Sequence, residues 1–370
     1  SGLSLNGTSS YITVPDSASL SFSQAHTIEA WTKFNSSFSA GSHSAPQPIV
    51  DKGNYKLYYD QITGKVNYEL ARSGATTWSQ VAGSDWIAGL YSKGLNNSWD
   101  QNGKPFINDS EVIGTDLYVG LGNTVGDAQV WKWNGSAWSV IGGNVVNSSW
   151  TEGSATPATQ YEQIVSMTTD GSNLYVGLGL TAGDAEVWKW NGSIWSKIGG
   201  DATGSAGQSW TNVYEQVTAL ATDGTNLFVG LGNTATDAEV WTCAISSCTT
   251  TSGWTKIGGD GTTVPPQSWG TSYEAVYSMA ISGTTLLVSL GNTAGDAELW
   301  SCTIGSCTVT TGWTKRGGDG SGTAPQSWAS VQEIIPQMAG SGTKVYLGLG
   351  NTGNEGQVWM CDLGVACTNT

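Results

Sequence analysis

The sequence predicts an all-β protein, and both its composition and an internal repeat support this prediction. The 370 residues include 51 glycines and 19 tryptophans, whereas only 12% of the residues are charged. Helical proteins carry Ala, Leu, Glu and Lys on helix surfaces, whereas this chain is rich in Gly, Ser, Thr, Asn, Val and Trp, which are typical of short strands and tight turns. A six-residue phrase, Leu-Tyr-Val-Gly-Leu-Gly in its first copy, occurs five times with small variations.

The copies of this phrase define a repeat of more than fifty residues. They begin at Leu117, Leu174, Leu227, Leu286 and Val345, so that successive copies are 57, 53, 59 and 59 residues apart. Repeats of this size that contain several short strands are typical of β-propellers. The sequence therefore predicts a five-bladed β-propeller over residues 73–370.

Each repeat contains enough strand-like runs for one blade. In the third repeat these runs cover residues 216–221, 227–232, 238–241 and 254–259, and they are separated by turn residues. In the first two repeats an Asn-Gly pair, the strongest local hairpin signal, separates the last two runs. We expect a four-stranded antiparallel blade from each repeat.

A second phrase indicates how the ring of blades closes. The phrase Trp-Ser/Thr-x-Ile-Gly-Gly begins at Trp138, Trp195 and Trp254, and a variant begins at Trp313. The fifth repeat lacks it, but a degenerate copy at residues 78–83 precedes the first repeat. We predict that residues 77–83 provide the outer strand of the last blade, which removes the strand edges that an open ring would expose.

The cysteines form three local pairs, and we predict a disulfide in each. The pairs are Cys243/Cys248, Cys302/Cys307 and Cys361/Cys367. Zinc binding is the competing interpretation, but zinc sites usually combine two such pairs or add histidines, and the two histidines lie far away in the sequence. Disulfides persist in oxidising compartments, so we expect an extracellular or cell-surface protein.

The net charge of −15 excludes some classes of partner. A negative field repels nucleic acid and anionic lipid, and no cluster of Lys and Arg offsets it locally. No run approaches the roughly 18–20 apolar residues that a membrane-spanning helix needs, so we expect neither nucleic-acid binding nor membrane insertion. Because the sequence opens with Ser, we expect that any signal or anchor has been removed.

The first 72 residues carry a different pattern of strand-like runs. These runs cover residues 3–16, 27–31, 49–58 and 64–70. The opening phrase, the run containing Trp31 and the following Lys-Gly run resemble the first half of a laminin-G-like (concanavalin-A-like) jelly roll. The resemblance covers about a fifth of the chain and implies an incomplete N-terminal β-sandwich. The missing half must come from the protein's own propeller or from a neighbouring molecule, and we favour the neighbour.

The predicted propeller gathers a repeated set of side chains on one face. In a four-stranded blade, the loop from strand two to strand three emerges on the same face as the loop from strand four to the next blade. We call this face the rim, and its repeated side chains are Trp, Tyr, Asp and Glu. Sugars stack on aromatic rings and form hydrogen bonds with carboxylates, so the rim is a candidate glycan site. The competing interpretation is that each Trp packs between blades and each Asp caps its own turn. The candidates are Trp150, Trp210, Trp269, Trp328, Asp127, Asp184, Asp237, Asp296, Tyr161, Tyr214, Tyr273, Glu162, Glu215 and Glu274.

These features favour binding over catalysis. General acid–base catalysis requires two groups whose pKa values differ, and near-equivalent acids on a symmetric ring do not provide them. We expect no cofactor, and we interpret the Ca²⁺ candidate loop that begins at Asp319 as a turn. The expected function is therefore a non-enzymatic extracellular binding or adhesion protein whose partner is a glycan or surface polymer. The alternatives are a filament or surface-layer subunit that self-associates through residues 1–72 and, third, a glycoside hydrolase.

Overall fold

The computed structural model shows an all-β protein whose chain divides into two compact units, residues 1–81 and 82–370. The predicted domain boundary after residue 72 lies outside the described residues. The structure describes residues 47–51, 55–60, 65–70, 107–122, 128–143, 146–150, 163–179, 185–201, 208–210, 216–232, 238–259, 267–269, 275–291, 297–319, 326–328, 334–350 and 356–365.

The described residues of the first unit form a three-stranded antiparallel sheet. Its strands are β1 (Gln47–Asp51), β2 (Tyr55–Asp60) and β3 (Lys65–Leu70), and they pair in the order β1-β2-β3. The predicted run 49–58 therefore belongs to two strands, and the predicted run 64–70 corresponds to β3. The runs 3–16 and 27–31 lie outside the described residues, so the laminin-G-like sandwich stays a prediction.

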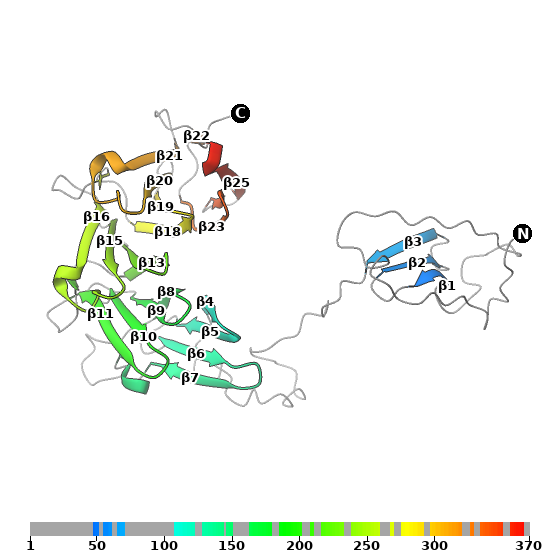
Figure 1. Ribbon diagram of the computed structural model, residues 1–370, viewed down its shortest axis with the longest axis horizontal. Coiled ribbons are helices and arrows are strands. Elements are labelled where there is room, and N and C mark those ends of the chain that lie inside the picture. The colour runs from blue at the N-terminus through cyan, green and yellow to red at the C-terminus, as the bar shows by residue number, and fades with distance from the viewer. Residues whose placement is uncertain are drawn as a thin grey trace, which may run out of the picture. The chain divides into compact units, whose positions relative to one another are not determined.

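The second unit is a propeller-like succession of small antiparallel groups of strands, which we name blades 1 to 5 in chain order (Figure 1). Blades 1 and 2 consist of β4 (Ile107–Ile113), β5 (Asp116–Leu121), β6 (Gln129–Trp133) and β7 (Trp138–Gly142), then β8 (Ile164–Thr169), β9 (Leu174–Leu178), β10 (Glu186–Trp190) and β11 (Trp195–Asp201). Blades 3 and 4 consist of β13 (Gln216–Thr222), β14 (Asn226–Gly232), β15 (Glu239–Ala244) and β16 (Trp254–Gly259), then β18 (Ala275–Ser282), β19 (Thr285–Gly291), β20 (Glu298–Thr303) and β21 (Trp313–Asp319). A pairing of β14 with β18 joins blades 3 and 4 into one sheet. The described strands of blade 5 are β23 (Gln337–Ser341), β24 (Lys344–Leu349) and β25 (Gln357–Asp362).

Short elements connect these blades. Three short strands each pair in parallel with the outer strand of the preceding blade: β12 (Gln208–Trp210), β17 (Gln267–Ser268) and β22 (Gln326–Trp328). The helices in the described part of the chain are the 3-10 turns η4 (Val146–Ser148), η6 (Thr251–Gly253), η7 (Thr310–Gly312) and η8 (Leu363–Val365). None of these turns has the length or the apolar character of a membrane-spanning helix.

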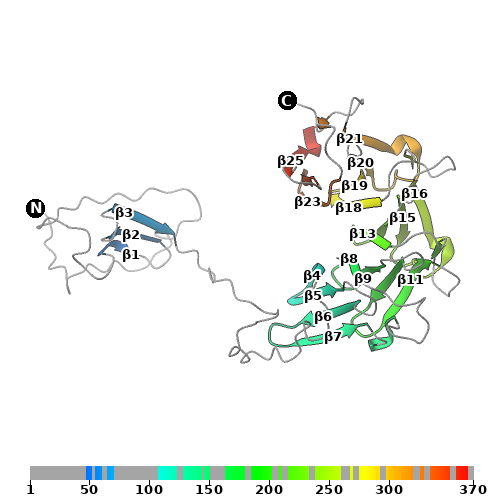
Figure 2. The ribbon, with the colours of Figure 1, turned by 180° about the vertical axis from the view of Figure 1, so that it is seen from behind.

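Successive blades lie against each other through their first strands, β4, β8, β13, β18 and β23 (Figures 1 and 2). Glycine in the second strand makes a close approach feasible at three of these seams. A Cβ added at Gly177 would lie 2.5 Å from Val217 Cγ1 of the next blade, and Gly120 and Gly230 are in the same position relative to Ile164 and Val276. Four of the five buried clusters among the described residues therefore join two neighbouring blades, and the fifth lies within blade 1.

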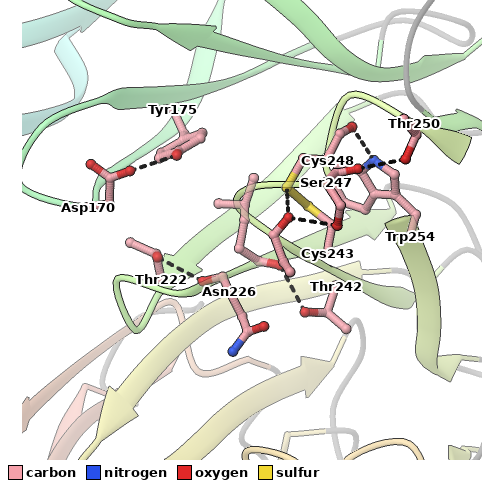
Figure 3. Close-up of a disulfide and its surroundings, with 12 residues drawn as sticks. Asp170, Tyr175, Thr222, Asn226, Thr242, Cys243, Ser247, Cys248, Thr250 and Trp254 are labelled. Atoms are coloured by element: carbon pink, nitrogen blue, oxygen red, sulfur yellow. Dashed lines mark hydrogen bonds between the residues drawn. A yellow bond between two sulfur atoms is a disulfide. The ribbon is translucent and has the colours of Figure 1, made fainter. Parts of the chain in front are cut away.

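Two of the three predicted disulfides are confirmed. Cys243 bonds to Cys248 and Cys302 bonds to Cys307, each with a Cα–Cα distance of 5.2 Å. Figure 3 shows the first of these bonds, where the Nε1–H of Trp254 donates to the Cys248 carbonyl at 2.7 Å. The disulfide hairpin is thus tied to the outer strand of its own blade. Cys367 lies outside the described residues, so the Cys361–Cys367 bond stays a prediction.

Candidate functional site

The structure describes only the tryptophans among the predicted rim residues. The ten Asp, Tyr and Glu candidates lie outside the described residues, namely Asp127, Asp184, Asp237, Asp296, Tyr161, Tyr214, Tyr273, Glu162, Glu215 and Glu274. Described neighbours flank them in the chain. The end of β5 at Leu121 pairs with the start of β6 at Gln129, and Gly122 forms a bridge to Gln163 at the start of the next blade. The segments that carry the candidates therefore begin and end at one edge of the blades.

The four rim tryptophans are packing residues, which corrects the expectation that they stack against a ligand. Trp150, Trp210, Trp269 and Trp328 are only 2% to 6% exposed. Trp150 lies between blades 1 and 2: its Nε1–H donates to the Ala128 carbonyl at 2.9 Å, and its ring centroid lies 5.2 Å from that of Trp195. Because neighbouring blades cover these indoles, they offer no free face to a sugar.

The same arrangement recurs at the other seams. Each rim indole lies over a glycine of the preceding outer strand; for example, a Cβ added at Gly199 would lie 2.9 Å from Trp210 Cη2. Trp210 and Trp269 also make edge-on contacts with Trp254 and Trp313 of the following blade. Among the described buried side chains, the Nε1–H groups of Trp210, Trp269 and Trp328 have no hydrogen-bond partner, in contrast to that of Trp150.

Three of the tryptophans that begin the outer strands, Trp195, Trp254 and Trp313, are also buried. The Nε1–H of Trp195 donates across the seam to the Ile141 carbonyl of blade 1 at 2.7 Å. In the disulfide-bearing blades the corresponding indoles, Trp254 and Trp313, donate instead to Cys248 and Cys307 within their own blade. Trp138 in blade 1 is half-buried against Trp133.

A charged constellation that the sequence analysis missed recurs in blades 2 to 4. In blade 2, Glu186 Oε2 accepts a hydrogen bond from Trp188 Nε1 at 2.7 Å, and the other oxygen pairs with Lys197. Buried carboxylates are costly unless they are paired and hydrogen-bonded, and this arrangement satisfies both requirements. The equivalent sets are Glu239, Trp241 and Lys256 in blade 3 and Glu298, Trp300 and Lys315 in blade 4.

Blade 1 breaks the symmetry with two carboxylates on its first strand. Asp109 Oδ2 accepts a hydrogen bond from the backbone N–H of Met167 in blade 2 at 2.6 Å, which joins the two first strands. Burial raises the pKa of Asp109, although hydrogen bonds from Met167 and Ser110 oppose the shift. Burial and the negative charge of Asp109 raise the pKa of Glu111 to about 7. The charged phrase Asn-Asp-Ser-Glu at 108–111, which has uncharged counterparts in the other repeats, is the signal that could have identified this pair.

The raised pKa predicts how Glu111 affects stability with pH. The fold favours the protonated form, so its contribution to stability is present below the ordinary value of 4.5 and is lost as pH rises toward about 7. We therefore expect Glu111→Gln to raise the melting temperature at pH 8 and to change it little at pH 4. Thermal denaturation followed by circular dichroism at both pH values measures this difference.

Asp223 provides a control of opposite sign. Burial would raise its pKa, but hydrogen bonds from Asn226 and Thr225 in its own turn outweigh that effect and hold the pKa below the usual value. Its stabilising contribution is present above the ordinary pKa and is lost as pH falls through the lowered one. Asp223→Asn should therefore lower the melting temperature at pH 8. A Glu111→Gln variant that is equally destabilised at both pH values would contradict the assignment.

Comparison with known proteins shows only remote likeness. No protein-family model and no curated protein matches the chain. Among solved structures, the chain is similar to a prolyl endopeptidase at 11% identity and a TM-score of 0.42, with 84% of this chain and 37% of that chain covered. It is also similar to PorZ, a surface component of the type-IX secretion system of Porphyromonas gingivalis, at 10% identity and a TM-score of 0.40, with 86% and 46% covered. Sqt1 from Chaetomium thermophilum gives 14% identity and a TM-score of 0.40, with 87% and 65% covered.

The chain spans less than two thirds of the length of each of these proteins. At such identities and TM-scores, their activities and partners carry no argument for this chain. The function of this chain is therefore inferred from its own residues.

Proposed function

We propose that this protein is a non-enzymatic extracellular binding or adhesion module built on a five-bladed β-propeller. The observation that carries the proposal is the repeated placement of candidate segments at one edge of rigid blades. In each of the first two seams, a bridge such as Gly122–Gln163 or Gly179–Gln216 holds the end of one blade's second strand beside the start of the next blade. Loops on a rigid scaffold are where binding residues usually lie. The two disulfides support an oxidising, extracellular location.

The proposal includes closure of the ring by residues 77–83 as the outer strand of blade 5. In blades 1 to 4 the third strand pairs with an outer strand, and β25 of blade 5 has no such partner among the described residues. The repeats also match charge across these two strands. Where the third strand carries Glu, the outer strand carries Lys, as in Glu186 and Lys197, whereas blade 1 has the uncharged residues Gln129 and Val140 at the two corresponding positions.

In blade 5, as in blade 1, the residue at the position of Glu186 is uncharged. The third strand of blade 5 carries Gln357, whose Oε1 accepts a hydrogen bond from Trp359 Nε1 at 2.8 Å. In the phrase 78–83, the position that corresponds to Lys197 is Gln80, which is also uncharged. An outer strand with Lys at that position would lack a carboxylate partner in blade 5. The sequence before the first repeat is thus electrostatically suited to β25.

We propose a glycan or surface polymer as the ligand. Because the four rim tryptophans are buried, Tyr161, Tyr214 and Tyr273 are the aromatic candidates that remain. Tyrosine combines an apolar ring with a hydroxyl group, and the adjacent glutamates supply acceptors for sugar hydroxyls. The binding surface would then repeat with the blades and favour a ligand that itself has repeating units.

A glycan array on the full chain tests this proposal. We expect binding to a repeating polysaccharide that falls at least about tenfold in Glu215→Gln, since the loss of one charged hydrogen bond of 1.5–3 kcal/mol corresponds to such a factor. Asp223→Asn is the matched control, because Asp223 lies in the turn between β13 and β14, at the opposite edge of blade 3. Absence of binding to every glycan, or equal losses in the two variants, would contradict the proposed rim.

A filament or surface-layer subunit is the alternative function. The observation that favours it is that residues 1–81 form their own compact unit, whose described residues make a three-stranded sheet, and a sheet this small needs a further partner to be stable. Strand donation from one molecule to the next builds an open filament unless the rotation closes. In that case the particle size would grow with concentration, and removing residues 1–70 would abolish the growth. A full-length chain that stays monomeric would exclude this alternative.

Glu111 provides the observation for the third function, a glycoside hydrolase. A carboxyl group with a pKa near 7 beside a second carboxyl group is the kind of asymmetric pair that acid–base catalysis uses. Against this, Asp109 is engaged in the hydrogen bond that joins blades 1 and 2. We therefore propose a structural role for the pair. Sugar release from a polysaccharide panel that disappears in Glu111→Gln would overturn it.

A further inference from the structure

Most of the exposed apolar side chains in the described residues belong to two faces at the ends of the blade series. One face, on the first strand of blade 1, carries Ile107 and Val112, which are 60% and 57% exposed. The other, on β24 and β25 of blade 5, carries Tyr346, Val358 and Met360, which are 42%, 81% and 52% exposed. The described residues include only two other exposed large hydrophobic side chains, so this exposure is concentrated and calls for an explanation.

The repeat shows that the blade 5 face is a seam face. Val358 corresponds to Val130, Val187 and Val240 in blades 1 to 3, and all three are fully buried. Each of them clusters with the first strand of the following blade; for example, Val187 packs in one cluster with Val217. The counterparts of Tyr346 are also buried, and each packs in one cluster with the first strand of the following blade. These counterparts are Tyr118, Tyr175, Phe228 and Leu287.

The blade 1 face has the complementary relationship. Ile107 corresponds to Ile164, Val217, Val276 and Ile335, the residues that contact the preceding blade, and all four are fully buried. Three of these rest against a glycine in the second strand of the preceding blade. The corresponding glycine in blade 5 is Gly348, and a Cβ added there would meet nothing within 4 Å. Blade 5 thus has an empty cradle, and blade 1 has the side chain that fits it.

We propose that the blade 5 face and the blade 1 face of the same chain pack against each other, with Ile107 seated on Gly348. This inference does not depend on the ligand proposed above. The same contact recurs at every described seam. A small residue on the second strand of one blade meets an aliphatic residue on the first strand of the following blade in the same chain. Because the two faces are tethered, intramolecular contact has a much higher effective concentration than contact with a second molecule.

A double-cysteine variant of the full chain, Gly348→Cys with Ile107→Cys, tests the contact directly. We expect a disulfide within the monomer, detected by peptide mapping and on a non-reducing gel. The matched control is Gly177→Cys with Val217→Cys, because a Cβ added at Gly177 would lie 2.7 Å from Val217 Cβ, close enough for a bond after a small adjustment. If the control bond forms, then a missing bond between positions 348 and 107 would overturn the proposal. Dimers linked through these cysteines would assign the faces to a second copy and would overturn it as well.

A single substitution gives an independent readout with opposite expected signs. Gly348→Val should lower the melting temperature by about 5 °C if the site faces Ile107, because overpacking a seam is destabilising. If position 348 instead faced solvent, Val would raise strand propensity and leave the melting temperature unchanged or higher. Gly230→Val is the control, since a Cβ at Gly230 already lies 2.7 Å from Val276 Cγ1. A loss at position 230 with none at position 348 would contradict the proposed contact.

Discussion

Replacing Trp210 by Ala should lower the free energy of unfolding by about 3–5 kcal/mol, the usual cost of removing a buried aromatic side chain. Trp210 is 5% exposed and contacts Gly199 of blade 2 and Trp254 of blade 3. The cavity would open between two blades, where neither sheet can collapse into it on its own. Chemical denaturation measures this loss. We expect the midpoint to fall while the slope of the unfolding free energy against denaturant concentration stays unchanged.

Conservative variants separate packing from hydrogen bonding at the seams. Trp210→Phe removes an Nε1–H that has no partner, whereas Trp150→Phe removes one that donates to the Ala128 carbonyl. We expect Trp150→Phe to cost about 1 kcal/mol more than Trp210→Phe. A rim tryptophan that bound ligand would instead tolerate Ala with a change within about 0.5 kcal/mol, as surface positions do, and that result would contradict the packing role.

The strands of the second unit could be predicted because their signals are local. In the third repeat, the run 254–259 coincides with β16, and the run 216–221 differs from β13 by one residue at its end. The alternation of apolar and polar residues in a strand and the Gly, Asn and Asp residues of the turns that bound it lie within a few residues of one another. No knowledge of the tertiary structure is therefore needed to recognise them. The same locality allowed the pairings Cys243–Cys248 and Cys302–Cys307 to be predicted.

The roles of the rim residues could not be predicted in the same way. A Trp that recurs in every repeat fits a ligand-binding rim and a packing seam equally well, and only the position of the neighbouring blade distinguishes them. The pKa of Glu111 likewise depends on burial, which its short sequence phrase does not encode. The Glu–Lys pairs join residues of adjacent strands that are separated by 11 to 17 positions. These pairs can be recognised from the sequence only if the Glu position and the Lys position are compared together across the repeats.

Removing residues 1–84 should destabilise the second unit by several kcal/mol. If residues 77–83 are the outer strand of blade 5, their loss leaves the free edge of β25 without its ladder. The corresponding strand in blade 3, β16, pairs with β15 through five residues, from Glu239 to Cys243. At a net 0.5–1.5 kcal/mol for each of about five hydrogen bonds, the loss is about 2.5–7.5 kcal/mol before any lost packing is counted. Removing only residues 1–70 should spare this strand.

The melting temperatures of these two truncated chains, measured beside the full-length protein, test most directly whether the blades form a ring closed by the N-terminal copy of the outer strand. A loss of about 2.5–7.5 kcal/mol corresponds to a decrease on the order of 10 °C in a unit of this size. We predict that the chain lacking residues 1–70 melts with the full-length protein in the transition of the second unit, and that the chain lacking residues 1–84 melts about that much lower or fails to fold. Equal melting temperatures for the two truncated chains would contradict the closed ring.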